Sequence, residues 1–364
     1  MEKALTPVSV GALADLEIPV TEAIPQRLED FARAVENTTQ AEGLAVLRQW
    51  LAEDLAAVED LLTELNQDRA AGVAEPLLAA GGKRIRPLCL LAASRLGDKE
   101  PSQHAVGLAT VVEYIHNATL LHDDVVDLAV ERRGQPTARM IHGNTVAVFA
   151  GDWLLVRALR LIHQTGSPWA LPAALDCIDE LIEAEILQIE LSQSGKESSA
   201  DYLRVIDGKT ASLFRLAFTY AGYLAGLDTE QREQLTGFAT HLGVAFQIQD
   251  DLLDLIGDPK QTGKPLFGDL AEGKLTLPIL WLLHREPRHR STIQALTHCA
   301  PEKMDIERVQ QLRKVLSSSG AIDASREMIE DRLREAHSNL DRLPKTVARS
   351  ALRLMTQLLV GRTS

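Results

Sequence analysis

Residues 120–127 read LLHDDVVD and residues 246–254 read FQIQDDLLD, so two Asp-Asp-x-x-Asp clusters are embedded in apolar, helix-forming sequence. On a helix, the first and last aspartates of each cluster lie on one face, because residues four positions apart are neighbours. Carboxylates grouped in this way repel one another unless a cation lies between them. Mg2+ prefers oxygen ligands and commonly bridges carboxylates to substrate phosphates. The pair of clusters therefore predicts a metal-dependent diphosphate site, whereas a single triplet would more simply be a solvated helix face.

Helical periodicity dominates the chain from about Leu44 onward. Apolar residues recur at three- and four-residue spacing in AVLRQWLAEDLAAVEDLLTEL (45–65) and DELIEAEILQIELSQ (179–193), and no segment of comparable length alternates with period two. This pattern predicts an all-α bundle formed by one domain, residues 44–364, after an N-terminal extension, residues 1–43. Within the extension, residues 21–37 are compatible with one amphipathic helix. Helix breaks are expected at 81–82, 134–136, 165–168, 195–199, 226–229, 258–265 and 286–288.

Composition limits the classes of partner. The chain has 364 residues, 45% of them hydrophobic, and a net charge of −13. This acidity repels nucleic acid and anionic membrane surfaces, so a phosphate-bearing ligand must be held by a local cluster of cations. The sequence has no signal-peptide pattern, and no stretch approaches the roughly 18 apolar residues of a membrane span. The widely spaced Cys89, Cys177 and Cys299 favour a reducing compartment over disulfides, so a cytoplasmic location is expected.

Cations cluster at several places in the same chain. The segment GGKRIRP, residues 81–87, places three of them after a glycine pair, where close backbone approach and planar guanidinium groups suit a diphosphate. A lone basic septet is more often ordinary surface. Further cations stand near the aspartate clusters, at Arg132, Arg133, Lys209, Lys264 and Lys274. Together they indicate phosphate binding beside the carboxylates.

Five motifs occur in an order that one enzyme family shares. They are GGKRIRP (81–87), LLHDDVVDLAVERRGQPT (120–137), GKTASLF (208–214), FQIQDDLLD (246–254) and GKPLFGDLAEGKLTLPIL (263–280). With them the chain resembles the trans-isoprenyl diphosphate synthases, or polyprenyl synthetase family, and most closely their bacterial long-chain members. The resemblance implies an all-α, isoprenoid synthase-type bundle around a central cavity, and a homodimer. It also implies an Mg2+-dependent prenyltransferase, with three ions per active site, that condenses isopentenyl diphosphate with an allylic diphosphate of farnesyl or geranylgeranyl type.

The resemblance assigns roles to matching positions. Metal binding is expected at Asp123, Asp127 and Asp250, with support from Asp124, Asp251 and Asp254. Isopentenyl diphosphate is expected at Lys83, Arg86, His116 and Arg133. The allylic diphosphate is expected at Arg132, Lys209, Thr210, Gln247, Lys264 and Lys274. The catalytic set comprises Asp123, Asp124, Asp127, Arg132, Lys209, Asp250, Asp251 and Asp254.

Several polar residues have a simpler structural explanation. A lone histidine in an apolar helix is more often a satisfied core residue, and only its place before the first cluster favours a substrate role for His116. Gln188 and Glu190 are explained equally well as structural residues and stay outside the predicted site. Trp153 departs from the Phe or Tyr that usually follows Gly-Asp in the resembling family.

Product length is expected to depend on Ala118 and Thr119, five and four positions before Asp123. A helix rises about 5.4 Å per turn, comparable with one isoprene unit, so residue size along this wall acts as a ruler. In the resembling family, aromatic residues at these positions stop growth at short products. Both residues are small here, which predicts a medium- or long-chain product of about 30 carbons or more, unless Tyr114 or another helix closes the path. The structural alternative is that Ala118 only permits close helix packing.

Three other functions were weighed against this one. A shorter-chain synthase, with products of about 15–20 carbons, would have the same motifs but a blocked tunnel. A terpene cyclase would need no site for a second diphosphate, so GGKRIRP, Arg133 and the second aspartate cluster count against it. A non-catalytic subunit of a heteromeric synthase would be expected to lack charged motif residues, and none is missing.

Overall fold

A computed structural model describes residues 40–64, 69–80, 82–97, 103–132, 134–194, 198–257, 266–299 and 304–360. This part of the chain is helical apart from one antiparallel hairpin of β1 (Glu131–Arg132) and β2 (Gln135–Pro136). The all-α prediction is therefore confirmed. The amphipathic helix predicted at residues 21–37 lies outside the described residues. Within the described ranges, no helix is long and apolar enough to cross a membrane.

The helices follow one another with short connections. The first half contains α2 (Gln40–Trp50), α3 (Ala52–Thr63), α4 (Arg69–Ala79), α5 (Ile85–Ala93), α6 (Ala105–Val126), α7 (Ala138–His142), α8 (Asn144–Thr165) and α9 (Ala170–Ser194). The second half begins with α10 (Ser199–Ile206), the π-helix η3 (Asp207–Ala211), α11 (Ser212–Leu224) and α12 (Thr229–Ile256). It ends with α14 (Gly268–Ala271), α15 (Leu277–Arg285), the 3-10 turn η4 (Pro287–His289), α16 (Arg290–Leu296), α17 (Ile306–Ser319), α18 (Ala321–Asp341) and α19 (Val347–Val360).

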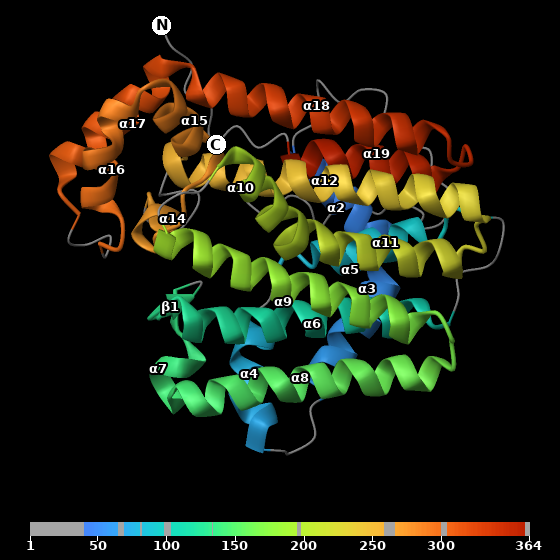
Figure 1. The fold of residues 1–364 in the computed structure, drawn as a ribbon. Coiled ribbons are helices and arrows are strands. Elements are labelled where there is room, and N and C mark those ends of the chain that lie inside the picture. The colour runs from blue at the N-terminus through green and yellow to red at the C-terminus, as the bar shows by residue number, and fades with distance from the viewer. Residues whose placement is uncertain are drawn as a thin grey trace, which may run out of the picture.

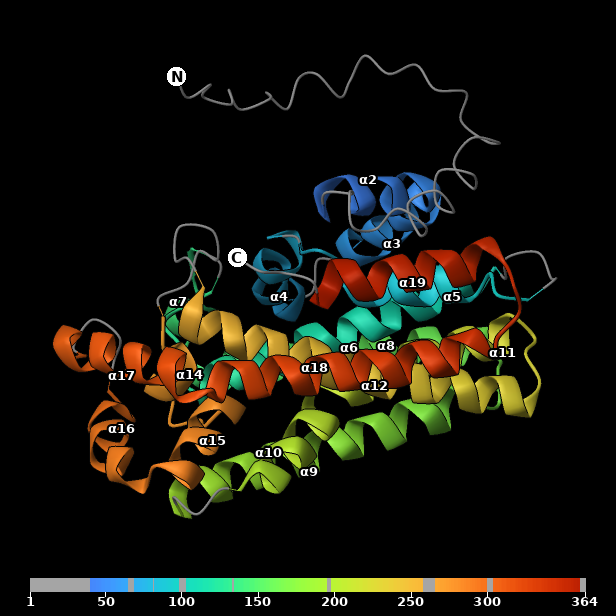
Figure 2. The same cartoon turned by 90° about the horizontal axis from the view of Figure 1, so that it is seen from above.

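The long helices run along a common direction and pack side by side (Figures 1 and 2). The helix α6 packs along α8 and α5, while α12 packs along α11 and α18. The C-terminal ends of α6 and α12 lie at the same end of the bundle, beside β1 and α14 in Figure 1. Each aspartate cluster occupies the last turns of one of these helices. The fold therefore brings the two clusters to one end of the bundle.

Capping side chains begin the two segments that carry the second half of the site. At the start of α12, the Asp228 carboxylate accepts from the Gln231 backbone N–H (2.8 Å), and the Gln231 side chain accepts from the Asp228 N–H (3.1 Å). Ser198 and Asp201 form the same reciprocal box at the start of α10. A cap of this kind stabilises a helix by about 1 kcal/mol. Both starts coincide with breaks predicted from the sequence, at 195–199 and 226–229.

One helix break had no signal in the sequence. Residues 45–65 show uninterrupted helical periodicity, but the structure divides them into α2 and α3 at Leu51, where φ is −111° and ψ is 20°. Leu47, Leu51 and Val58 are all buried across this change of direction. Because the apolar spacing continues through the break, periodicity alone could not locate it.

Aromatic residues of α11 and α12 fill the centre of the bundle. Phe214, Phe218 and Tyr220 are fully buried, and Phe218 meets Phe238 of α12 edge-on, with ring centroids 5.2 Å apart. Burial of each such ring contributes about 1.5–3 kcal/mol to folding. Since η3 directly precedes α11, this packing fixes the start of α11 and with it the position of η3.

Candidate active site

The first aspartate cluster meets two lysines from distant parts of the chain. Asp123 lies in the last turn of α6, and Asp127 follows as its C-terminal cap. The Asp123 carboxylate lies 3.5 Å from Lys209 Nζ, and the Asp127 carboxylate lies 2.8 Å from Lys274 Nζ. Burial disfavours the charge of Lys274, but the carboxylates of Glu272 and Asp127 outweigh it and raise the pKa of this lysine. The end of α6 therefore presents carboxylates and ammonium groups to one volume.

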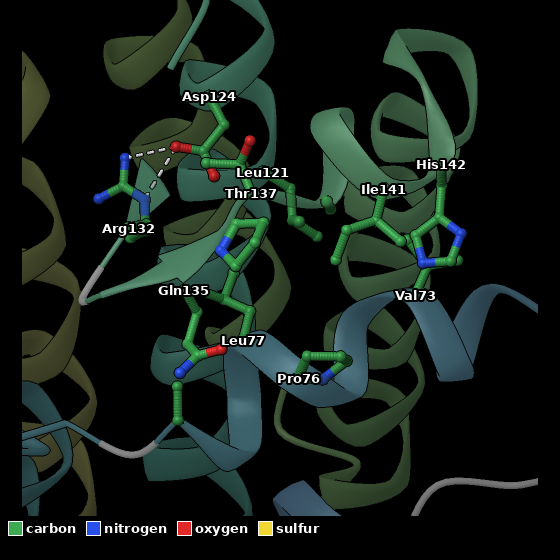
Figure 3. A pocket seen from close by; sticks show the side chains of 13 residues that line it. Val73, Pro76, Leu77, Leu121, Asp124, Arg132, Gln135, Thr137, Ile141 and His142 are labelled. Atoms are coloured by element: carbon green, nitrogen blue, oxygen red, sulfur yellow. Dashed lines mark hydrogen bonds and ion pairs between the residues drawn. The ribbon is translucent and has the colours of Figure 1, made fainter. Parts of the chain in front are cut away.

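The middle aspartate of this cluster has a different environment. Asp124 is buried, and Arg132 donates to its Oδ1 through Nε (2.9 Å), with a second guanidinium nitrogen 2.8 Å away (Figure 3). Burial raises the pKa of Asp124, and the bonds from Arg132 partly oppose this. Since Arg132 belongs to β1, the pair ties the hairpin to the last turn of α6.

Arg132 and Asp124 line a pocket between α4, α6 and α7, where Val73 and Pro76 form another wall (Figure 3). Lys209 and Lys274 line a second pocket, of which Arg132 is not a lining residue. The structure therefore separates Arg132 from the other described candidates for the allylic diphosphate. The reason is the helix itself, because adjacent residues point about 100° apart and Asp124 faces away from the side of Asp123.

The second cluster is held by a chain of hydrogen bonds through three elements. Asp251 of α12 is buried and accepts from the Tyr202 hydroxyl of α10 (2.6 Å) and from Gln247 Nε2 (2.7 Å). The Gln247 amide oxygen in turn accepts from the Thr210 hydroxyl of η3 (2.7 Å). Burial raises the pKa of Asp251 well above its ordinary value. Two predicted residues, Thr210 and Gln247, are thereby connected to the cluster.

The other two aspartates of this cluster differ in exposure. Asp250 is exposed, whereas Asp254 is largely buried and accepts from the Gly268 backbone N–H at 2.9 Å. The second oxygen of Asp254 is buried without a hydrogen-bond partner among the described residues. Burial, together with the nearby charge of Asp269, raises the pKa of Asp254 to about 8. A buried, unpartnered carboxylate oxygen is a site at which a cation would be strongly stabilising.

Five predicted residues share one pocket at this end of the bundle: Lys209, Thr210, Gln247, Asp251 and Lys274. Tyr202 and Asp269 also line it, and sequence reasoning had missed both. Asp269 lies inside the motif GKPLFGDLAEGK, so its position was quoted without its acid being considered. Tyr202 lies outside every motif and offered no signal.

Lys209 is held by a carboxylate that the sequence reasoning had missed. Its Nζ lies 2.5 Å from Glu185 Oε1 and donates to the Gln188 amide oxygen at 3.3 Å, both on α9. Burial raises the pKa of Glu185, and the charge of Lys209 opposes this shift. Gln188 and Glu190 had looked equivalent from the sequence, but Gln188 lines the pocket while Glu190 is exposed.

The three cations of GGKRIRP have three different environments. Arg84 is buried in a left-handed backbone conformation (φ 46°) and bonds to Glu59, Glu113 and the Leu78 carbonyl oxygen. Arg86 has a buried side chain whose Nε has no hydrogen-bond partner among the described residues. Lys83 is exposed. The septet therefore contains one structural cation and two that remain candidates for ligand binding.

Arg86 lies in an apolar setting. Its guanidinium carbon is 5.3 Å from the centroid of the Phe214 ring. Burial lowers its pKa, while the carboxylates of Glu113 and Asp250 oppose that shift. A guanidinium held in this way keeps unused donors for an anion, which is consistent with a diphosphate ligand.

We expect Arg84→Gly to destabilise the fold by about 3–5 kcal/mol, because it leaves the buried Glu113 carboxylate without its partner. Glycine adopts the left-handed conformation without strain, so the change isolates the loss of the guanidinium. Arg334→Ala is the matched control, since Arg334 makes an exposed pair with Asp331 within one helix and should contribute less than about 1 kcal/mol. Urea unfolding would measure both, and equal losses would contradict the structural role of Arg84.

The residues proposed for chain length lie one to two turns before Asp123. Ala118 is fully buried, and His116 and Thr119 are half-buried. The Thr119 hydroxyl donates to the His116 carbonyl oxygen at 2.8 Å, so its polar group is satisfied within α6. The Tyr114 hydroxyl donates to the Leu61 carbonyl oxygen of α3 at 2.7 Å, which directs this ring toward α3. The roles of these residues stay predictions.

Two predicted ligand contacts, Arg133 and Lys264, lie outside the described residues, as does Gly81. Within the described residues, no three carboxylate, imidazole or thiolate side chains already converge to form a ready metal centre. The donors at the end of the bundle are nonetheless all carboxylate oxygens, which are the ligands Mg2+ takes. One of them, on Asp254, is buried and unpartnered, so the donor set fits such an ion.

Known proteins match most of this chain. The polyprenyl synthetase family model matches residues 67–316. The all-trans-nonaprenyl-diphosphate synthase (geranyl-diphosphate specific) of Rhodobacter capsulatus is 36% identical over 86% of this chain and 96% of its own. The octaprenyl diphosphate synthase of Escherichia coli is 34% identical over 88% of this chain and 99% of its own. A polyprenyl synthase from Caulobacter crescentus, crystallised with calcium and isoprenyl diphosphate, superposes with a TM-score of 0.81 at 35% identity, covering 88% of this chain and 98% of that one. The chain has their all-α isoprenoid synthase fold and belongs to the polyprenyl synthetase family.

Proposed function

We propose that this protein is a polyprenyl diphosphate synthase that condenses isopentenyl diphosphate with an allylic diphosphate to a medium- or long-chain trans-polyprenyl diphosphate. The observation that carries the proposal is the meeting of the two aspartate clusters with Lys209 and Lys274 at one end of the bundle. The curated relatives quoted above, which make octaprenyl and nonaprenyl diphosphates by name, support the chain-length class.

Mg2+ is the proposed cofactor, with three ions per active site. Asp123, Asp127 and Asp250 would hold it, because they supply carboxylate oxygens from both clusters. When bound, Mg2+ supplies positive charge that stabilises the leaving diphosphate. Lys209 and Lys274 already neutralise Asp123 and Asp127 in part, which lets so many carboxylates share one volume.

The allylic diphosphate would lie against Lys209, Thr210, Gln247 and Lys274, with Lys264 and Arg132 as further candidates. Fixed ammonium groups are already in place where negative charge grows on the leaving diphosphate, so the transition state gains more than the ground state. As the C–O bond breaks, the double bond of isopentenyl diphosphate forms the new C–C bond and a proton is lost. The released diphosphate is the proposed proton acceptor.

Isopentenyl diphosphate would lie against Lys83, Arg86, His116 and Arg133. Arg86 is buried beside Phe214, so a diphosphate bound there would meet a cation that water does not screen. Holding the two substrates in one orientation also lowers the entropic barrier to their reaction.

Diphosphate release should depend on both substrates together. With Mg2+ present, we expect release when farnesyl diphosphate and isopentenyl diphosphate are supplied together, and background levels with either one alone. A coupled phosphate assay measures this directly. Release from farnesyl diphosphate alone would favour a terpene cyclase instead.

Arg86→Ala should mainly raise the Michaelis constant for isopentenyl diphosphate, by about 10- to 100-fold, which corresponds to the 1.5–3 kcal/mol typical of a charge-assisted hydrogen bond. The constant for the allylic substrate should stay within about twofold, a range of roughly 0.4 kcal/mol. Steady-state kinetics with each substrate varied in turn would measure both. A rise in the allylic constant alone would show that the two sites have been interchanged.

A homodimer is proposed through an apolar face of α8 and α9. Phe149 of α8 is 64% exposed, and Ile182 and Ile186 of α9 are about half exposed. The same face includes Val146, Val156, Leu171, Leu175 and Ile189. A continuous apolar surface of this kind on two neighbouring helices is typical of an interface, and a second copy of the chain is the proposed occupant. The three cysteines are free thiols, which fits the proposed cytoplasmic location.

The double variant Ile182→Asp, Ile186→Asp should be monomeric, because four carboxylates would be buried at a two-fold interface. Light scattering after size exclusion should give half the mass of the wild type. Ile306→Asp is the matched control, since Ile306 is 72% exposed on α17 and away from this face, and it should stay dimeric. A wild type that is already monomeric would contradict the proposal.

A further inference from the structure

Two adjacent residues of the site stand on a short π-helix. The segment η3, Asp207–Ala211, joins α10 to α11 without a loop. Lys209 points toward α6 and α9, where it meets Asp123 and Glu185, while Thr210 donates to Gln247 of α12. A π-turn is rare, and it adds one residue to a helix at the expense of hydrogen-bond geometry. Something outside η3 must therefore favour it over an ordinary α-turn.

On one side, η3 approaches α9 so closely that a side chain at position 208 would collide. A Cβ added to Gly208 would lie 2.6 Å from the Ala184 Cβ and 2.9 Å from the Glu180 backbone oxygen. Both distances are shorter than real Cβ contacts, and the second involves backbone that cannot swing aside. Gly208 is therefore needed for this approach.

On the opposite side, α12 approaches η3 through another glycine. A Cβ added to Gly243 would lie 2.6 Å from the Ala211 Cα and 2.8 Å from its Cβ. Ala211 is the last residue of η3 and is fully buried. The π-turn is thus enclosed between α9 and α12, with one glycine at each contact.

The ends of η3 are also anchored. Arg215 donates to the Asp207 carboxylate at 2.8 Å, and the Ser212 hydroxyl donates to the Gly208 carbonyl oxygen. These bonds fix both ends of the turn but do not choose between a π-turn and an α-turn for the residues between them. The two glycine contacts make that choice, because they set how far η3 lies from each neighbouring helix.

We propose that Gly208 and Gly243 are positioning residues that hold η3 as a π-turn, so that Lys209 and Thr210 reach the allylic diphosphate together. The inference rests on the proposed function, because it takes the ligand of Lys209 and Thr210 to be that diphosphate. Loss of the extra residue from the turn would rotate Lys209 by about 100° relative to α11. Its ammonium group would then leave Asp123 and Glu185. A shift of about 1 Å in a positioning group is enough to reduce a rate by about 100-fold.

The test compares Gly208→Ala and Gly243→Ala with a matched control, Gly107→Ala. Gly107 lies in α6, and a Cβ there meets nothing within 4 Å. The probe is farnesyl thiodiphosphate, an unreactive allylic analogue, titrated calorimetrically with Mg2+ present. We expect each site variant to bind it about 10- to 100-fold more weakly. The control should bind it as the wild type does.

Two further readouts separate positioning from general damage. The Michaelis constant for isopentenyl diphosphate should stay within about twofold of the wild type, about 0.4 kcal/mol. The second substitution Ala184→Gly should restore part of the binding lost in Gly208→Ala, because it removes the 2.6 Å contact and leaves the one at 2.9 Å. If Gly208→Ala does not fold, the double variant and Gly243→Ala decide the question.

Folded site variants that bind the analogue as tightly as the wild type would overturn the inference. So would an equal loss of affinity for both diphosphates, or no rescue by Ala184→Gly. A wild-type protein that does not bind the analogue would instead count against the proposed function.

Discussion

Replacing Asp123 by alanine, or Asp250 by alanine, should reduce turnover by at least about 100-fold, the usual effect of losing one preorganised electrostatic contact in an active site. Asp123 is one of two α6 carboxylates that face lysines from η3 and the segment before α15. Asp250 is exposed at the end of α12, beside Asp251. If the two clusters hold Mg2+ together, removing a ligand from either one should have the same consequence.

The measurement is turnover of each variant over a range of Mg2+ concentrations. Asp331→Ala serves as the matched control, because Asp331 is an exposed carboxylate of α18 that pairs only within its own helix in the described contacts. The control should keep wild-type turnover. Near-normal turnover of Asp123→Ala or Asp250→Ala, without added Mg2+, would contradict the metal assignment.

Ala118→Phe should shift the products from about 30 carbons or more to about 15–20, while the first condensation stays active. Ala118 is fully buried on α6, between Ile115 and Leu121, which are also buried. Five residues of helix span about 7.5 Å, so a phenyl ring at this position would stand little more than one isoprene unit below Asp123. The Tyr114 ring is tied to Leu61 of α3, which leaves Ala118 as the position whose size should decide the length.

Chromatography of the dephosphorylated products would give the distribution. Ala118→Leu provides an intermediate side chain and should give an intermediate length. A thermal melt of each variant separates a blocked tunnel from a damaged core, since a larger side chain in a packed core destabilises by about 1–3 kcal/mol. An unchanged distribution in a folded, active Ala118→Phe variant would place the floor of the tunnel elsewhere.

The helical architecture was predictable because its signals are local. Capping residues and Gly or Pro clusters stand at the ends of α10 and α12, and the structure begins both helices there. The spacing of the two aspartate clusters also indicated that each would present carboxylates from a helix end. The division at Leu51 was not predictable, since the apolar pattern continues through it.

The site was predictable to the extent that its residues lie in motifs. Lys209, Thr210, Gln247 and Lys274 were expected to act together, and they line one pocket. The exact partners were not predictable, because they depend on tertiary packing. Glu185 came from a helix with many acids, and only the fold shows that it is the one beside Lys209.

Residue type alone also could not separate structural from binding cations. Arg84 and Arg86 are two positions apart in the same motif, yet Arg84 pairs with Glu59 and Glu113 while the Arg86 side chain meets the Phe214 ring. The difference follows from the left-handed conformation of Arg84, which turns its side chain toward α3 and α6. Asp124 and Arg132 illustrate the same limit, since each was expected in the main site and they pair with each other.

The central claim is that the two aspartate clusters join isopentenyl diphosphate to an allylic primer. The most direct measurement incubates the purified protein with Mg2+, farnesyl diphosphate and radiolabelled isopentenyl diphosphate, and then separates the dephosphorylated products by length. We expect label in polyprenyl chains of about 30 carbons or more, and none when the metal is chelated. Label that stays in isopentenyl diphosphate with folded protein, or a cyclic hydrocarbon formed without it, would contradict the claim.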